Sequence, residues 1–152
     1  MLQKRQNLPR DSTQLDIDPR TPEGRTPLHI AAAKCHHGLL RLLLEHCSNV
    51  NARDDWGRTP LHFAAAGSPG ESEELVKLLL SRNADFDLPD NDGWTALTYA
   101  AQAGNERVVR RLLDKGSNPN ATNGAINTPL DMAVLSNSEQ IVEWLLKRGA
   151  DP

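Results

Sequence analysis

The sequence is poor in the features that mark membrane, secreted or nucleic-acid-binding proteins. Aromatic residues make up 4% of the 152 residues. No apolar stretch approaches the ~20 residues that a membrane-spanning helix needs. The N-terminus has basic residues but no apolar segment after them, so it does not resemble a secretory signal. Basic residues number 17 against 20 acidic ones, and this net charge of −3 lacks the concentrated positive surface that nucleic-acid binding requires. We therefore expect no membrane insertion and no nucleic-acid partner.

Cysteine is equally scarce, since the chain holds only Cys35 and Cys47. Two cysteines do not make a disulfide framework, so a reducing cytoplasmic setting, with a nuclear one as the alternative, fits best. The two are separated by eleven residues. A helix between them would hold them roughly 15 Å apart, too far for one metal ion. We therefore expect no metal and no cofactor. The candidate metal ligands are Cys35, His36, His37, His46 and Cys47.

Motifs of catalysis are also missing. The chain contains no G-x-S-x-G, P-loop or H-E-x-x-H pattern. Carboxylates are numerous, but paired catalytic acids need a pocket that separates their pKa values. The candidates Asp54, Asp55, Asp90 and Asp92 are expected on turn tips in open solvent. We therefore expect no catalytic residue and no enzyme within this chain.

What the sequence does contain is an internal repeat. GRTPLHIAAAK begins at Gly24, GRTPLHFAAAG at Gly57, GWTALTYAAQA at Gly93 and INTPLDMAVLS at Ile126. The threonines of these copies fall at positions 26, 59, 95 and 128, so the spacings are 33, 36 and 33 residues. A leucine-rich second element follows each copy. A fixed period of this length is the signature of a repeat solenoid.

Each copy predicts a pair of helices. Threonine followed by proline is typical of a helix start, because the hydroxyl accepts from free backbone N–H groups and proline suits the first helical position. Leu28, Ala31 and Ala32 then share one helical face, where alanine allows close approach of a neighbour. One helix pair cannot cover its own apolar face, so stability must come from stacking. In the first repeat, the second-helix residues expected to be buried are Leu39, Leu40, Leu43 and Leu44.

The 33-residue period with T-P-L-H and G-A-D elements resembles the ankyrin repeat over residues 14–152. The resemblance implies an all-α ankyrin-repeat solenoid of stacked helix-turn-helix pairs with protruding hairpin loops. We expect residues 1–20 to be an N-terminal segment that carries the remnant of a preceding repeat loop. Its apolar residues Leu2, Leu8, Leu15 and Ile17 would act as a partial cap. The ankyrin repeat domain would span residues 21–152, with repeats at about 21–53, 54–89, 90–122 and 123–152.

The copies differ at positions that matter for helix starts and ends. Thr98 and Asp131 replace the histidine of the first two copies and are expected to make polar contacts in its place. Glycine or asparagine ends most of the helices, but Cys35 and Cys47 stand there in the first repeat. In the second repeat the insertion GSPGES lengthens the turn, and we expect the helix to restart at Ser72.

His29 and His62 lie three residues after their threonines, at the repeat spacing. An active-site histidine would not be copied in this way. The family resemblance implies that these histidines form local hydrogen bonds and brace neighbouring loops. It also implies that loop asparagines such as Asn51 and Asn120 can be hydroxylated by an asparaginyl hydroxylase. The alternative, which we favour, is that the two asparagines hold their hairpins.

The resemblance further implies a cupped shape that binds a partner protein through its concave face and hairpin tips. Trp56 and Trp94 are expected on adjacent hairpins, and tryptophan and arginine are the residues most enriched at interface hot spots. A local alternative is that Arg58 stacks on Trp94 across repeats, worth ~0.5–1 kcal/mol at an exposed site. The candidate partner-binding residues are Glu23, Arg25, Lys34, Asp55, Trp56, Arg58, Asn91, Asp92, Trp94, Gln102, Asn127 and Leu135.

The sequence therefore predicts a non-enzymatic protein-interaction module that acts as a monomer. Two alternatives stay open. The array could be the targeting or substrate-recognition part of a larger enzyme or effector whose catalytic domain lies outside this chain. It could also be a purely structural repeat with no partner on its concave face.

Overall fold

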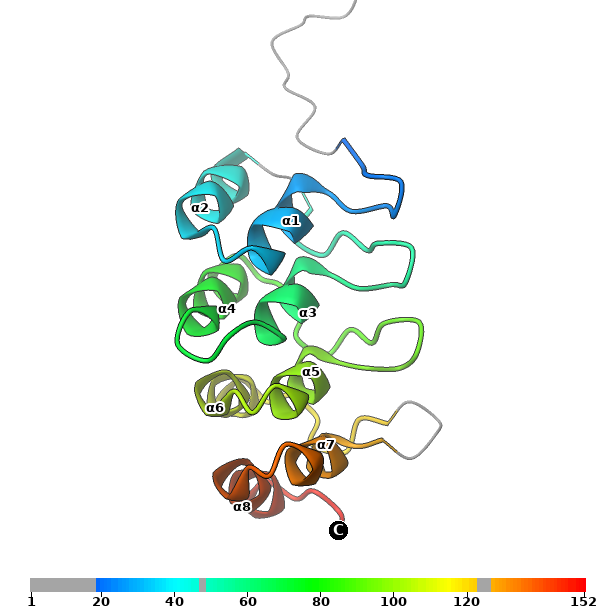
Figure 1. The fold of residues 1–152 in the computed structure, drawn as a ribbon, viewed down its shortest axis with the longest axis vertical. Helices are drawn as coiled ribbons and strands as arrows, with labels where there is room; N and C mark the ends of the chain where they lie inside the picture. Colours follow the sequence, from blue (N-terminus) through cyan, green and yellow to red (C-terminus); the bar gives the residue numbers. More distant parts are fainter. Residues whose placement is uncertain (1–18, 47–48, 123–126) are drawn as a thin grey trace, which may run out of the picture.

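The computed structural model describes residues 19–46, 49–122 and 127–152, in which eight helices stack as two columns (Figure 1). The first column contains α1 (Pro27–Ala33), α3 (Pro60–Ala65), α5 (Ala96–Gln102) and α7 (Pro129–Leu135). The second contains α2 (His37–His46), α4 (Ser72–Ser81), α6 (Glu106–Lys115) and α8 (Glu139–Lys147). Each helix contacts its pair partner and its column neighbours. The described residues hold no strand, so the prediction of an all-α repeat solenoid is confirmed.

The helices of the first column begin where the sequence predicts. Each follows a threonine with extended backbone, and proline occupies the first helical position in α1, α3 and α7. Proline is suited to that position because its N–H would have no helical partner there. The prediction that Asp131 and Thr98 replace the histidine contacts is also confirmed. Thr128 N donates to Asp131 Oδ2 at 2.8 Å, and the hydroxyls of Thr95 and Thr98 lie 3.2 Å apart.

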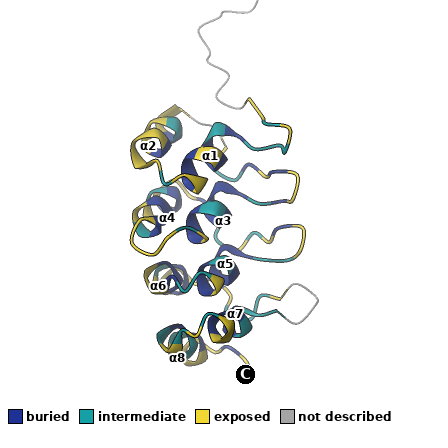
Figure 2. Cartoon of the chain, in the orientation of Figure 1, coloured by how far each residue is buried: buried dark blue, intermediate teal, exposed yellow. Residues whose placement is uncertain are grey.

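The core runs without interruption between the two columns, where Figure 2 shows the buried residues. Alanines at equivalent positions of the first-column helices, such as Ala32, Ala65 and Ala101, are fully buried, which allows the close stacking predicted for them. Leucines at one repeat position of the first three copies, Leu28, Leu61 and Leu97, are also buried. Burial of each leucine contributes roughly 1.5–3 kcal/mol to the stability of the fold. The leucines are buried only because the adjacent repeat covers them.

The prediction that Leu39 is buried is wrong. Its side chain is 53% exposed, whereas Leu40 and Leu44 are buried and Leu43 is half-buried. Helix α2 is the first of its column, and among the described residues α4 is the one helix of that column that packs against it. Among the described residues, no neighbouring repeat covers the face of α2 that carries Leu39. The expected cap from residues 2–17, the helix end at Cys47 and the turn at 123–126 lie outside the described residues.

Helices and turns end where glycine-like conformations are available. Cys35 has the left-handed φ of 55° that glycine adopts most easily, and Asn83 and Asn137 take similar values. In the second repeat α4 restarts at Ser72, as predicted, and its hydroxyl donates to the carbonyl of Ser68 at 2.9 Å. The hairpin loops project on the side of the first column (Figure 1).

No helix in the described parts of the chain combines the length and the apolar character needed to cross a membrane.

Candidate protein-interaction surface

Three hairpin loops are described, and we name them by their turns: the first hairpin is residues 21–25, the second 54–58 and the third 90–94. They share one backbone geometry. In the second hairpin Asp54 N donates to Arg58 O at 2.9 Å, and Gly57 N donates to Asp54 O at 2.9 Å. Gly57 has a φ of 75°, a conformation that favours glycine, so the repeated glycine is required by the turn. Each hairpin is thus a closed turn.

Consecutive hairpins are also tied to one another. Asp55 N donates to Glu23 O at 3.1 Å, and Asn91 N donates to Trp56 O at 2.9 Å. The Asn91 side chain adds a second link, from its Nδ2 to Asp55 O at 3.0 Å. These hydrogen bonds join each hairpin tip to the next one, so the tips form a ladder. The ladder holds the tips in place without a bound partner.

The histidines of the first two copies brace this ladder from below. His29 Nε2 lies 2.9 Å from Arg58 O, and His62 Nε2 lies 3.0 Å from Trp94 O. Carbonyls can only accept, so Nε2 carries the proton. On the other side of each ring, Nδ1 accepts from the backbone N–H of its threonine, at 3.1 Å for Thr26 and 2.9 Å for Thr59. Burial lowers the pKa of both histidines, which keeps the rings neutral. The bracing role that the resemblance implied is confirmed.

The prediction that Asp54 and Asp90 lie in open solvent is wrong, because each is only 6% exposed. Asp54 Oδ1 accepts from Trp56 N at 3.1 Å and from Arg58 N at 2.8 Å. Asp90 Oδ1 accepts from the third hairpin in the same way, at 2.9 Å from the N–H groups two and four residues later. The turn directs these N–H groups inward, and the carboxylate is buried because it accepts hydrogen bonds from them. Asp55 and Asp92 are exposed, as expected.

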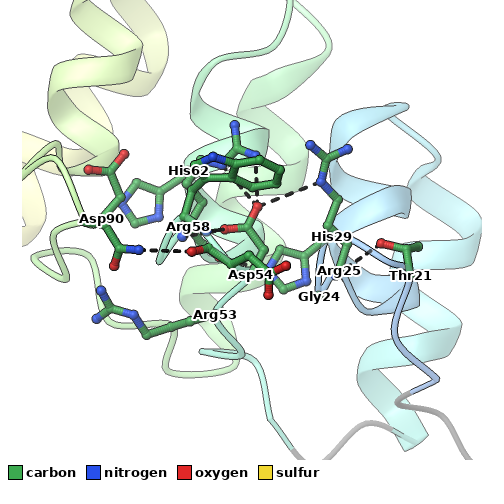
Figure 3. A network of polar contacts seen from close by, with 12 residues as sticks. Thr21, Gly24, Arg25, His29, Arg53, Asp54, Arg58, His62 and Asp90 are labelled. Atoms are coloured by element: carbon green, nitrogen blue, oxygen red, sulfur yellow. Dashed lines mark hydrogen bonds and ion pairs between the residues drawn. The ribbon is translucent and has the colours of Figure 1, made fainter.

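The second oxygen of Asp54 holds an arginine. Arg58 donates to Asp54 Oδ2 from Nε at 3.0 Å and forms an ion pair through Nη2 at 2.9 Å. Arg25 approaches the same oxygen at 3.7 Å, from the first hairpin (Figure 3). A distance of 3.7 Å is too long for a hydrogen bond. Arg58 is therefore hydrogen-bonded to the Asp54 carboxylate, whereas Arg25 interacts with it only as an ion pair.

The two guanidinium groups lie against aromatic rings. Arg58 is 4.9 Å from the Trp56 ring centroid and 4.7 Å from that of Phe63. The corresponding distances for Arg25 are 5.8 Å and 5.2 Å. These distances are within the range of cation–π attraction. We name Arg25, Arg58, Trp56 and Phe63 the arginine–aromatic cluster.

The predicted stacking of Arg58 on Trp94 is wrong. Asp54 draws Arg58 back over its own hairpin, and Trp94 packs against Tyr99 with 5.2 Å between ring centroids. The sequence reasoning missed Phe63 and Tyr99. A signal was present, since both stand four residues after the repeat threonine in consecutive copies.

The remaining candidate residues lie on the hairpins or on the C-terminal parts of the first-column helices. Trp56 is 48% exposed and Leu135 is 76% exposed. Trp94 is half-buried and borders an open hollow with Asp92, Tyr99 and Gln102. The other exposed candidates are Lys34, Asp55, Asn91 and Gln102, and the other half-buried ones are Glu23, Arg25, Arg58 and Asn127.

The cysteine and histidine cluster gathers no ligand set within the described part of the chain. No group of three or more histidine, cysteine, aspartate or glutamate side chains there could hold a metal ion. His37 Nε2 instead contacts the carbonyl of Glu71 at 3.0 Å, which links α2 to the inserted turn of the next repeat. Burial raises the pKa of the Cys35 thiol. Cys47 lies outside the described residues.

The two loop asparagines have a structural role, but the loops that they hold belong to the following repeat. Asn51 Oδ1 accepts from Asp85 N at 2.8 Å, and Asn120 Oδ1 accepts from Asp151 N at 2.8 Å. Each side chain thus fixes the loop of the following repeat.

Comparison with known proteins gives one consistent result. The family model described as ankyrin repeats (3 copies) matches residues 6–90 and 65–152. Ankyrin repeat protein nuc-2 of Neurospora crassa is 37% identical over 108 residues, which cover 68% of this chain and 10% of that protein. Ankyrin repeat, SAM and basic leucine zipper domain-containing protein 1 of Carollia perspicillata is 36% identical over 98 residues, covering 62% and 20%.

A human relative is similar to a lesser degree. Transient receptor potential cation channel subfamily A member 1 is 30% identical over 100 residues, 66% of this chain and 9% of the channel. This chain therefore spans about a tenth to a fifth of the length of these three relatives.

Proposed function

Because this chain belongs to the ankyrin repeat family, whose repeats generally mediate protein–protein interaction, we propose that it is a non-enzymatic module that binds a partner protein through its concave face and hairpin tips. The observation that carries the proposal is Trp56. Trp56 remains 48% exposed at the tip of the second hairpin, although Arg58 lies over its ring. An exposed tryptophan on a fixed loop is a typical anchor of an interface hot spot.

The hydrogen-bonded ladder of hairpin tips supports this assignment. Binding loses affinity when side chains and loops must be ordered, so a surface that is already ordered binds more tightly for the same contacts. Asp55 N to Glu23 O and Asn91 N to Trp56 O supply that order before a partner arrives. We propose that the partner contacts this ladder and the exposed C-terminal parts of the first-column helices. The proposed contact residues are Glu23, Arg25, Lys34, Asp55, Trp56, Arg58, Asn91, Asp92, Trp94, Gln102, Asn127 and Leu135.

The test is affinity capture with a matched pair of tryptophan variants. We expect Trp56→Ala to lose a protein that the unmodified chain captures from its native cell extract, as measured by quantitative mass spectrometry. Trp144→Ala is the control, because Trp144 lies on α8 in the second column and is half-buried there. It should retain the captured protein. Both variants should first show helical circular dichroism and cooperative melting. Equal capture by Trp56→Ala and the unmodified chain would contradict the assignment to this face.

A second possibility is supported by the length of the relatives. The matched region is about a tenth to a fifth of each of them, so in those proteins it accompanies much additional chain. In this version the same surface is the targeting or substrate-recognition part of a larger enzyme or effector. The coding sequence on either side of these residues distinguishes the two versions, because a catalytic domain there would support the second.

The module is proposed to act as a monomer in the cytoplasm or nucleus, with no nucleic-acid partner. Sedimentation equilibrium of the purified chain should give a single species of about 16.7 kDa. A species of twice that mass would contradict the monomer.

A further inference from the structure

Two consecutive hairpins contain the same buried carboxylate, but different groups satisfy it. Asp54 and Asp90 each use Oδ1 for two backbone N–H groups of their own turn. The second oxygen of Asp54 faces Arg58 and Arg25, whereas that of Asp90 accepts from the Tyr99 hydroxyl at 2.6 Å. The second oxygen of Asp54 therefore has cationic partners, whereas that of Asp90 has a neutral one.

Two guanidinium groups face the second oxygen of Asp54, and the other carboxylates of the first two hairpins are Glu23 and Asp55. In the first hairpin Thr21 stands at the position of Asp54, so Arg25 has no carboxylate at that position of its own turn. It reaches instead to Asp54, which already forms two short contacts with Arg58. Arg25 Nε is buried without a hydrogen-bond partner among the described residues. Two cations therefore share one carboxylate, and their side chains remain 34% and 24% exposed.

The third hairpin has an excess of negative charge. Tyr99 is a neutral donor, since burial and the adjacent Asp90 both raise the pKa of its hydroxyl. No ion pair joins Asp90 or Asp92 to a basic side chain within residues 19–46, 49–122 and 127–152. Asp92 is exposed beside the open hollow whose other walls include Trp94, Tyr99 and Gln102. Aromatic faces and a carboxylate together suit a cationic side chain.

We propose that this face binds an extended segment of the partner that carries an acidic and a basic side chain. The acidic side chain binds Arg25 and Arg58 of the arginine–aromatic cluster, and the basic side chain enters the hollow beside Asp92. Guanidinium groups bind carboxylates with directed, charge-assisted hydrogen bonds. Consecutive helices of a stack lie ~8–10 Å apart, and an extended chain advances ~3.3 Å per residue. The two charged residues should therefore stand about three positions apart.

This inference rests on the proposed function, and a peptide selection tests the two separately. A random peptide library displayed on phage would be selected against the unmodified chain, Arg25→Gln and Asp92→Lys. The double variant Trp56→Ala/Trp94→Ala would serve to subtract background. Charge-matched controls away from the face are Arg107→Gln on α6 and Glu74→Lys on α4, whose side chains are 71% and 66% exposed. Circular dichroism would verify that each variant is folded.

The unmodified chain should enrich peptides with an acidic and a basic residue about three positions apart. Arg25→Gln should lose the acidic preference, and Asp92→Lys should replace the basic residue with an acidic one, while both controls keep the original pattern. For a synthesised winner, changing its Glu to Gln should weaken binding about tenfold to the unmodified chain and far less to Arg25→Gln. Enriched peptides without the charge pair, or a pattern unchanged in both variants, would overturn this inference alone. No enrichment above the double tryptophan variant would contradict the proposed function as well.

Discussion

Asp54 shows how much of a hairpin can depend on one residue. Its carboxylate accepts two backbone N–H groups of the turn and also holds the guanidinium of Arg58 over Trp56. Turn tips are usually solvated, so the sequence alone predicts that Asp54 is exposed to solvent. Asp54 is buried instead, because the backbone N–H groups of the turn point toward the first residue of the turn, which is Asp54. The sequence contains Asp at this position in two copies and Thr in another, and the structural consequence of that difference depends on the partner of each side chain.

Asp54→Asn should destabilise the fold by about 1–3 kcal/mol. The amide keeps an oxygen for the turn but no longer neutralises Arg58 and Arg25, which are held close together. Urea denaturation monitored by circular dichroism measures the change in the free energy of unfolding. Asp55→Asn is the control, since Asp55 is the adjacent exposed carboxylate and should change stability by less than about 0.5 kcal/mol. Equal effects of the two substitutions would show that burial of Asp54 is unimportant.

The braced histidines give the fold a specific dependence on pH. Their pKa in the folded state is lowered from the ordinary 6.5, mainly by burial, and Nδ1 is already an acceptor. The unfolded chain therefore binds more protons, so stability is greatest above pH 6.5 and is lost as the pH falls below it. The shifted carboxylates titrate below their ordinary 4.5, outside this window.

The check is the difference in the free energy of unfolding between about pH 7.5 and about pH 5.5, a range that includes the ordinary pKa of histidine. Between these limits the unmodified chain should lose stability. His62→Thr should lose less, because threonine occupies this position in the third copy, where Thr98 does not titrate. The matched control is His36→Thr, the same substitution at an exposed position. A slope that is the same in all three proteins would contradict the bracing role of His62.

At the scale of the element, the hairpins are rigid because their turns and their links to one another use the same few backbone groups. The sequence predicted the helix starts correctly, since the Thr-Pro signal is local and acts on the next turn of helix. It failed for Leu39, because burial on a helix face depends on a neighbouring repeat that the period alone does not supply. It also failed for Arg58, whose stacking partner was decided by Asp54 within the same hairpin.

Gly57→Ala should destabilise the second hairpin by about 1 kcal/mol or more. Its φ of 75° disfavours a side chain, and the added Cβ would stand 2.9 Å from the backbone N of Asn91. That contact would strain the link between the second and third hairpins. Gly38→Ala is the matched control, because outside the local backbone of α2 no atom of the described residues lies within 4 Å of its added Cβ. Alanine there should stabilise the helix by up to about 1 kcal/mol. The measurement is the free energy of unfolding of both variants. A Gly57→Ala variant as stable as the unmodified chain would contradict the requirement for glycine in this turn.

At the scale of the molecule, the solenoid separates stability from recognition. The core between the two columns holds the stack together, and the hairpins project from one side of it (Figure 1). Periodicity was sufficient to predict this architecture, since every repeat must bury its apolar face against the next. The partner of each buried hairpin carboxylate was not predictable from the repeat alone. It follows from the particular residues that differ between copies: Thr21, Asp54 and Asp90 in the turn, and Phe63 and Tyr99 on the helix beneath.

The central claim is that a partner protein contacts the hairpin tips, and site-specific photocrosslinking tests it most directly. A benzophenone amino acid placed at position 56 would be irradiated in native extract and compared with the same group at position 144 on the second column. The account predicts a covalent adduct with one partner from position 56 and none with that partner from position 144, with both proteins melting cooperatively. The same adduct from position 144, with none from position 56, would contradict it.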